Sequence, residues 1–139
     1  MVEQRTLGRI AMSKRTTIQL EIRSMSSPDV EFYSWEPTTN ADIFFLVEME
    51  IGQVGVDGAD LFQIVIATPE ALRARARMGT NTIRERSTLV VSNYDWLNIQ
   101  QAIAAIVRKC ESETWVASTL RLQRYFKWEY EDYQAEVGS

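Results

Sequence analysis

The side chains of this chain that could do chemistry are carboxylates and aromatics, and they gather in two stretches. Residues 40–67 contain five acidic residues and no lysine or arginine, and residues 126–133 contain three acidic and four aromatic residues. Carboxylates are costly to bury unpaired, whereas aromatics stabilise a fold when buried. We therefore expect each stretch to have a packed side and a negative side that faces water or a cationic partner. The candidate binding residues are Glu48, Glu50, Asp57, Asp60, Trp128, Glu129, Tyr130, Glu131, Asp132 and Tyr133.

The chain has no histidine and a single cysteine, Cys110. These counts exclude a histidine general base, a Ser-His or Cys-His nucleophile pair, an imidazole metal ligand and an intrachain disulfide. Cys110 falls on the apolar stripe of an expected helix, so we interpret it as a core residue rather than a reactive thiol. We expect no catalytic residue, no metal and no cofactor, and hence no enzyme. The enzymatic alternative pairs Glu48 and Asp60 as general acid and base across a hairpin cleft.

The formal net charge of −4 disfavours nucleic acid as a partner, because neutralising phosphates requires a surplus of lysine and arginine. A run of arginines opposes this trend: Arg73, Arg75, Arg77, Arg84 and Arg86. We interpret the run as a solvated helix face whose aliphatic stems pack down. The alternatives are that it pairs with the acidic C-terminal stretch, or that it binds an anion in a housekeeping interaction or small-ligand module without catalysis.

The length of 139 residues favours one domain. No stretch approaches the roughly 20 apolar residues that a membrane-spanning helix needs. The first sixteen residues are basic but lack the apolar segment of a secretory signal. We expect a flexible leader over residues 1–16, within which Met12 is an alternative start, and a single domain over 17–139. The expected protein is cytoplasmic, has no membrane partner, and leaves its oligomeric state open.

Four segments have the pattern of a strand. Residues 17–25 alternate apolar and polar side chains, and residues 42–51 do so with a second face that changes from apolar to charged. Glycines and the dipeptide Asp57-Gly58 predict a turn after this second strand, so residues 59–67 should pair back as an antiparallel hairpin. Residues 87–92 are the fourth expected strand.

Three helices are expected, each from a start signal. Thr68 is the expected N-cap of a helix that runs to about Met78, with proline and glutamate in its first turn. Asn93 is the expected cap of a helix to about Cys110, and Ser112 that of a shorter helix. The order of these elements predicts an α+β fold, an antiparallel-dominated sheet of about four strands with three helices packed on one face.

Three stretches, taken in order, resemble a known family. They are Ile51-Gly52 … Gly58-Ala59-Asp60-Leu61-Phe62 … Thr68-Pro69, then Glu113-Thr114-Trp115 leading to Leu122 and Tyr125, and then Trp128-Glu129-Tyr130-Glu131-Asp132-Tyr133. With the earlier Ser26-Ser27-Pro28-Asp29, their order and spacing are similar to the immunity protein 8 family of bacterial polymorphic-toxin systems over roughly residues 20–133. The chain departs from the family pattern at Ala71-Leu72, where an aromatic is expected.

The resemblance implies a non-enzymatic, cytoplasmic inhibitor that binds the C-terminal toxic domain of a secreted or contact-delivered toxin. Neighbouring toxins in such systems are often nucleases, and the family does not fix which toxin is bound. The acidic and aromatic candidates named above are then the expected toxin contacts. Acidic side chains can mimic phosphate and steer association with a basic cleft, and aromatics often anchor interfaces.

Overall fold

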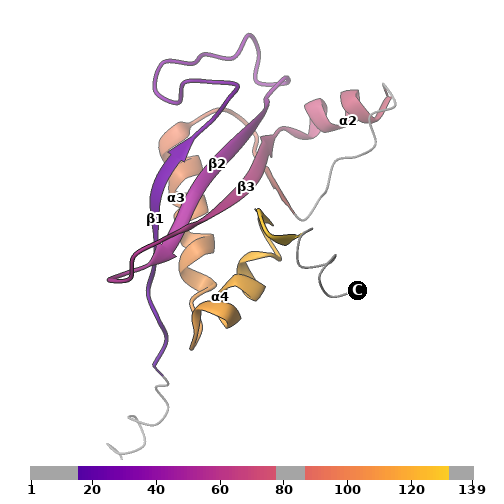
Figure 1. Ribbon diagram of the computed structural model, residues 1–139. Coiled ribbons are helices and arrows are strands. Elements are labelled where there is room, and N and C mark those ends of the chain that lie inside the picture. The colour runs from indigo at the N-terminus through magenta and orange to yellow at the C-terminus, as the bar shows by residue number, and fades with distance from the viewer. Residues whose placement is uncertain (1–15, 78–86, 132–139) are drawn as a thin grey trace, which may run out of the picture.

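A sheet of five strands forms the centre of the part of the chain that the computed structural model describes, residues 16–77 and 87–131 (Figure 1). Strands β1 (Leu20–Ser26), β2 (Phe44–Gln53) and β3 (Asp60–Ala67) pair antiparallel in this order. Two short strands share the outer edge of β3. β4 (Thr88–Val90) pairs parallel with its C-terminal part, and β5 (Lys127–Trp128) pairs antiparallel near its start. The predicted α+β fold with a mainly antiparallel sheet is confirmed.

The two faces of the β2–β3 hairpin differ in burial, as the alternation of the sequence predicts. On one face every second side chain of β2 from Phe45 to Ile51 is fully buried, and Phe62 and Ile64 of β3 lie opposite them. The other face is half-buried or exposed, and we call it the outer face. It consists of Phe44, Leu46, Glu48 and Glu50 of β2 with Leu61, Gln63 and Val65 of β3.

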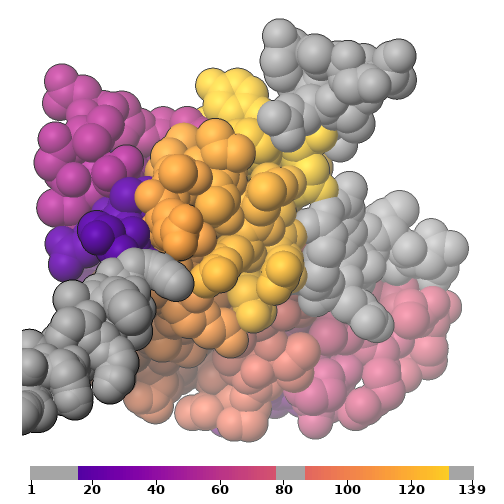
Figure 2. Space-filling model, turned by 90° about the horizontal axis from the view of Figure 1, so that it is seen from below, coloured from indigo at the N-terminus to yellow at the C-terminus, as the bar shows by residue number. Residues whose placement is uncertain are grey.

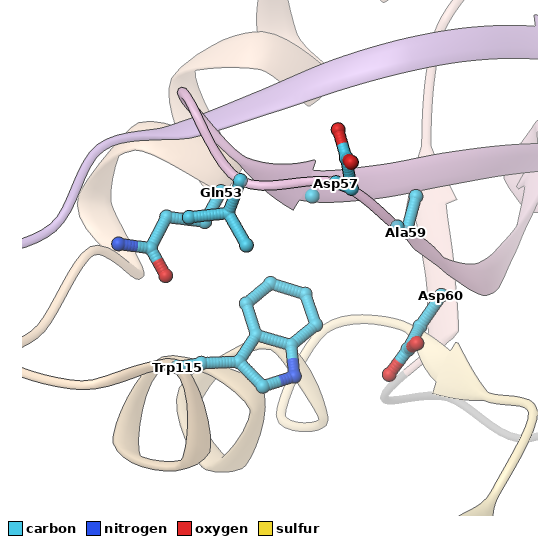
Figure 3. A pocket seen from close by; sticks show the side chains of 8 residues that line it. Gln53, Asp57, Ala59, Asp60 and Trp115 are labelled. Atoms are coloured by element: carbon cyan, nitrogen blue, oxygen red, sulfur yellow. The ribbon is translucent and has the colours of Figure 1, made fainter.

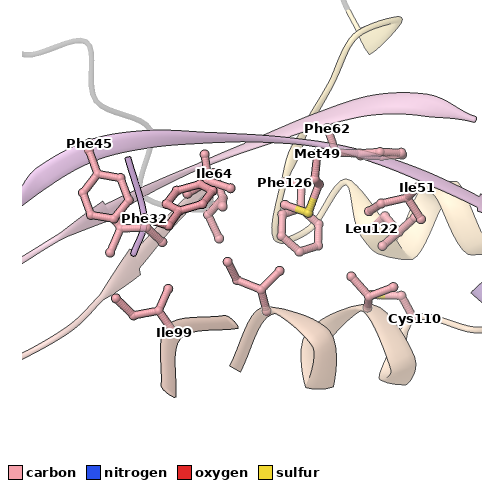
Figure 4. Close-up of a cluster of buried hydrophobic side chains, with 14 of the residues drawn as sticks. Phe32, Phe45, Met49, Ile51, Phe62, Ile64, Ile99, Cys110, Leu122 and Phe126 are labelled. Atoms are coloured by element: carbon pink, nitrogen blue, oxygen red, sulfur yellow. The ribbon is translucent and has the colours of Figure 1, made fainter. Parts of the chain in front are cut away.

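Helices α3 (Trp96–Lys109) and α4 (Trp115–Leu122) supply the side chains that cover the buried face (Figure 4). Ile99 and Ile103 of α3 and Leu122 of α4 are each nearly or fully buried. Burial of such a side chain stabilises the fold by about 1.5–3 kcal/mol, so this contact holds the two layers together.

Helix α2 (Pro69–Arg77) occupies a different place, beyond the end of β3 (Figure 1). Its buried residue is Ala71, and the guanidinium of Arg75 lies 3.6 Å from the centroid of the Phe44 ring, on the outer face. Two of the three predicted helices, α3 and α4, thus cover the core. The third, α2, lies beyond the end of the sheet. The C-terminal part of the arginine run, with Arg84 and Arg86, lies outside the described residues.

The predicted helix starts were right at one helix and wrong at two. Thr68 caps α2 by accepting from the Ala71 amide at 3.3 Å. The cap of α3 is Asp95 instead of Asn93, and the cap of α4 is Thr114 instead of Ser112. In both cases a second capping residue stands two positions further along, and its side chain accepts from the amide three residues ahead.

Packing of aromatic side chains explains the later start of α3. The ring of Phe32 stacks on Trp96 with centroids 3.8 Å apart, and the Tyr94 hydroxyl donates to the Phe32 carbonyl at 2.5 Å. These contacts draw Tyr94 against the core, and the helix begins after it, with Asp95 as its cap. Burial, and then the charges of Glu31 and Tyr33, raise the pKa of Tyr94.

The expected leader over residues 1–16 lies outside the described residues except for Thr16, so it stays a prediction. Within residues 16–77 and 87–131, the helices are too short or too polar for any of them to cross a bilayer.

Candidate functional site

The tip of the β2–β3 hairpin is held by Arg23 of β1. Its guanidinium donates to three loop carbonyl oxygens, those of Gln53 at 2.6 Å, Val56 at 2.6 Å and Gly58 at 2.8 Å. Its Nε donates to Glu21 at 3.0 Å. Gly52 permits this approach, because a Cβ there would lie 2.7 Å from both Arg23 Cζ and the Gly58 oxygen. The loop that carries Asp57 is thus fixed to β1.

The structure brings the hairpin and the C-terminal stretch together, although they lie 68 residues apart in the sequence. Trp128 Nε1 donates to Asp60 Oδ2 at 3.0 Å. The Leu61 amide donates to Glu129 Oε2 at 2.7 Å, and the Glu129 amide donates to the Leu61 carbonyl at 3.0 Å. Glu131 Oε1 accepts from the Trp128 amide at 3.4 Å. We call this group of contacts the β3–β5 junction.

Glu48 and Glu50 lie beside this junction on the outer face. Gln63 Nε2 donates to Glu48 Oε2 at 3.0 Å, and Ser24 Oγ donates to Glu50 Oε1 at 3.1 Å. Glu50 is exposed and pairs in register with Leu61 of the junction. The two glutamates therefore present their charge at the same end of the sheet as the junction.

The alternative of Glu48 and Asp60 as a catalytic acid and base is wrong. Glu48 stands opposite Gln63 on the outer face, whereas Asp60 stands opposite Ile51, whose side chain is in the core. Since residues of a strand alternate between faces, the two carboxylates point to opposite sides of the sheet. They share no cleft in which one substrate could meet both.

The remaining predicted residues differ in accessibility. Asp57 is exposed at the hairpin tip, and Tyr130 is 44% exposed. Trp128 is 8% exposed and stacks on Phe62 with centroids 6.4 Å apart, so its ring packs within the fold. Asp132 and Tyr133 lie outside the described residues. Direct contact of any of these residues with a toxin stays a prediction.

A cavity of about 270 Å³ opens between the hairpin tip and α4 (Figure 3). Asp57 and Asp60 belong to its hairpin side, and the indole of Trp115, the first residue of α4, forms the facing wall. Trp115 is half-buried, so part of its ring faces the opening. Figure 3 shows the Asp60 carboxylate on the indole side of the cavity, whereas the Asp57 carboxylate points away from the indole. A carboxylate beside an aromatic ring suits a cationic group, which gains from both.

Sequence reasoning named Asp57 and Asp60 of this cavity but missed its apolar surroundings. Four exposed apolar side chains lie on the same two segments: Val54 and Val56 in the hairpin loop, and Val116 and Leu120 on α4. Figure 2 shows the hairpin (magenta) next to α4 (orange) on one side of the molecule. The sequence does contain a signal for the exposed apolar pair on α4. Val116 and Leu120 are four residues apart, so they share one face of the helix, and that face is not the buried one.

The described residues offer little for metal or thiol chemistry. Among residues 16–77 and 87–131, no group of three or more histidine, cysteine, aspartate or glutamate side chains could hold a metal ion. Cys110 is 1% exposed, and burial raises the pKa of its thiol despite the opposing charges of Lys109, Arg121 and Arg124. The interpretation of Cys110 as a core residue is confirmed.

Comparison with known proteins identifies the family. Neither the curated proteins nor the solved structures gave a match to this chain. The sequence model of the family described as immunity protein 8 matches residues 20–133, a range that contains every strand and helix described above. Because this match covers most of the sequence, the chain belongs to the immunity protein 8 family.

Proposed function

We propose that this immunity protein neutralises its cognate toxin, a secreted or contact-delivered domain, by stoichiometric binding in the cytoplasm. The observation that carries the proposal is that the fold gathers carboxylates from distant parts of the sequence at one end of the sheet. They are Glu48, Glu50, Asp57, Asp60, Glu129 and Glu131. Glu48 and Glu50 lie on the outer face and Asp60 on the opposite side, so this end of the sheet is negative on both faces. Such a charge attracts a basic partner and speeds its association.

A nuclease is the toxin class that fits this surface best. A nuclease must hold the phosphates of its substrate, so its cleft is lined with lysine and arginine. Carboxylates of an inhibitor can occupy the positions that phosphates would take. Binding of this kind requires no catalytic residue of the inhibitor, in agreement with a chain that has no histidine.

Co-expression with the C-terminal domain of the toxin encoded beside this gene tests the proposal. With a tag on the toxin domain only, we expect a one-to-one complex and survival of cells that the toxin domain alone would kill. The association rate should fall as salt is raised, because the Debye length shrinks from about 10 Å at 0.1 M to about 3 Å at 1 M. Absence of a complex would refute the proposal.

A pair of matched variants tests the role of the acidic surface. Glu48→Gln/Glu50→Gln should slow association, since both side chains lie on the outer face near the junction. Asp42→Asn/Glu70→Gln changes the net charge equally, but these residues lie at the other end of the hairpin, before β2 and after β3. Equal association rates for the two variants would show that the outer-face carboxylates do not steer the toxin.

A further inference from the structure

The geometry points to the cavity between the hairpin tip and α4 as the seat of one cationic side chain, an arginine or a lysine, of the bound toxin. This inference rests on the proposed function and names the contact within it. The residues that would hold the cation are Asp60 and Trp115, and Asp57 adds a second negative charge at the hairpin tip.

The size of the cavity suits a side chain. Its volume of about 270 Å³ is below the roughly 300–1,000 Å³ that is typical of pockets for drug-sized ligands and cofactors. The indole of Trp115 supplies an apolar wall for the aliphatic stem and a π-face for the charged head. A buried nucleotide or cofactor would need more room.

The charge around the cavity is negative. Asp57 and Asp60 contribute two full charges, whereas the amino end of α4 contributes roughly half a positive charge. One amide at that end is already satisfied, because the Ala117 amide donates to Thr114 Oγ1 at 3.0 Å. Arg23 of β1 adds a positive charge at the hairpin tip, but its ion pair with Glu21 at 3.0 Å offsets that charge, and its guanidinium is bonded to loop carbonyls. A cation is therefore the group that the cavity favours.

The Asp60 carboxylate and the backbone of the loop that bears Asp57 are held in place before any partner arrives. The indole of Trp128 fixes Asp60 through its 3.0 Å bond, and the clamp of Arg23 fixes the loop that bears Asp57. A site that is already ordered loses less entropy on binding than one that must be ordered by its partner.

The two segments that border the cavity carry exposed apolar side chains, of which Val56 lines the cavity itself. Val54 and Val56 are 45% and 49% exposed on the hairpin loop, and Val116 and Leu120 are 66% and 60% exposed on α4. Exposed apolar side chains that flank a pocket are typical of a surface that a protein partner covers. In a complex they would exclude water from the cation and strengthen its attraction to the carboxylates.

Three variants of the full chain test the inference in the complex with the toxin domain. Asp57→Asn/Asp60→Asn removes the charge while leaving an oxygen that can accept from Trp128. Trp115→Leu removes the π-face, and Trp115→Phe retains one. We expect the first two to weaken the complex by about tenfold or more and Trp115→Phe to weaken it less. Asp42→Asn/Glu70→Gln is the charge-matched control, and thermal unfolding shows that each variant is folded.

The outcomes separate this inference from the proposed function. If the native chain binds the toxin and the cavity variants bind within about twofold of the control, the inference is overturned and the proposed function stands. If Trp115→Leu weakens binding but Asp57→Asn/Asp60→Asn does not, the occupant is apolar and the cationic assignment is overturned. If the native chain forms no complex, the proposed function fails and the inference fails with it.

Discussion

Replacing Arg23 with alanine removes the clamp on the hairpin tip. The three bonds to loop carbonyls are charge-assisted, but the side chain is 26% exposed, so water replaces them when it is lost. We therefore take about 0.5 kcal/mol for each bond, the lower end of the usual range, which gives about 1.5 kcal/mol for Arg23→Ala. A domain of this length unfolds with an entropy of about 0.3 kcal/mol/K, so the Tm should fall by about 5 °C.

Calorimetry or urea unfolding of matched variants measures this loss. Arg23→Lys should lie between the native chain and Arg23→Ala, because an ammonium lacks the planar fork that reaches several carbonyls at once. Arg73→Ala is the control, since Arg73 is an exposed arginine of α2. Its free energy of unfolding should change by no more than about 0.5 kcal/mol.

A double-mutant cycle with Gly52 tests the geometry directly. Gly52→Ala places a Cβ 2.7 Å from Arg23 Cζ and from the Gly58 oxygen, which should cost about 1–3 kcal/mol. In the Arg23→Ala background the first of these clashes is absent, so the cost should be smaller by about 0.5 kcal/mol or more. Costs that add within about 0.3 kcal/mol would refute the placement of the guanidinium over Gly52.

Three further predictions concern the core and the β3–β5 junction. Ellman's reagent should modify Cys110 only on unfolding, because the thiol is buried and its pKa is raised; rapid reaction of the folded protein would contradict this. The raised pKa of Tyr94 means that its stabilising effect is present below about pH 10 and is lost as the pH rises through the folded-state pKa. Urea unfolding of Tyr94→Phe should therefore show a weaker alkaline loss of stability than the native chain; an unchanged loss would assign it to other groups. Trp128→Phe should cost about 1 kcal/mol by removing the donor to Asp60, whereas Asp60→Asn, which keeps an acceptor, should cost less in the same assay; equal costs would argue against this bond.

Much of the fold could be predicted because its strands have a period of two. The alternation from Phe45 to Ile51 identified both the strand and its buried face, and Asp57-Gly58 marked the turn, where Gly58 has a φ of 94°. The caps of α3 and α4 were misplaced because two capping residues compete within three positions. At α3 the choice depends on the packing of Tyr94, which a local pattern does not contain.

The site was harder to predict, because its parts meet through distant contacts. β5 has only two residues, so no periodicity marks it as a strand, and its partner β3 lies more than sixty residues earlier. The proximity of Asp60 to Trp128 could therefore not be read from either stretch alone. The cavity beside Trp115 depends on the position of α4 relative to the hairpin, which is likewise a product of tertiary packing.

The division of one strand edge between β4 and β5 has a consequence for how the protein is made. The edge of β3 near Phe62 and Gln63 is closed by Lys127 and Trp128. At a synthesis rate of about 5–20 residues per second, the ribosome needs roughly 3–12 s to extend the chain from the end of β3 to Trp128. During that interval the edge beside the acidic hairpin has no β5, and the indole that positions Asp60 does not yet exist. The hairpin therefore acquires its assembled acidic surface only after the segment that contains Trp128 has been made and has paired with β3.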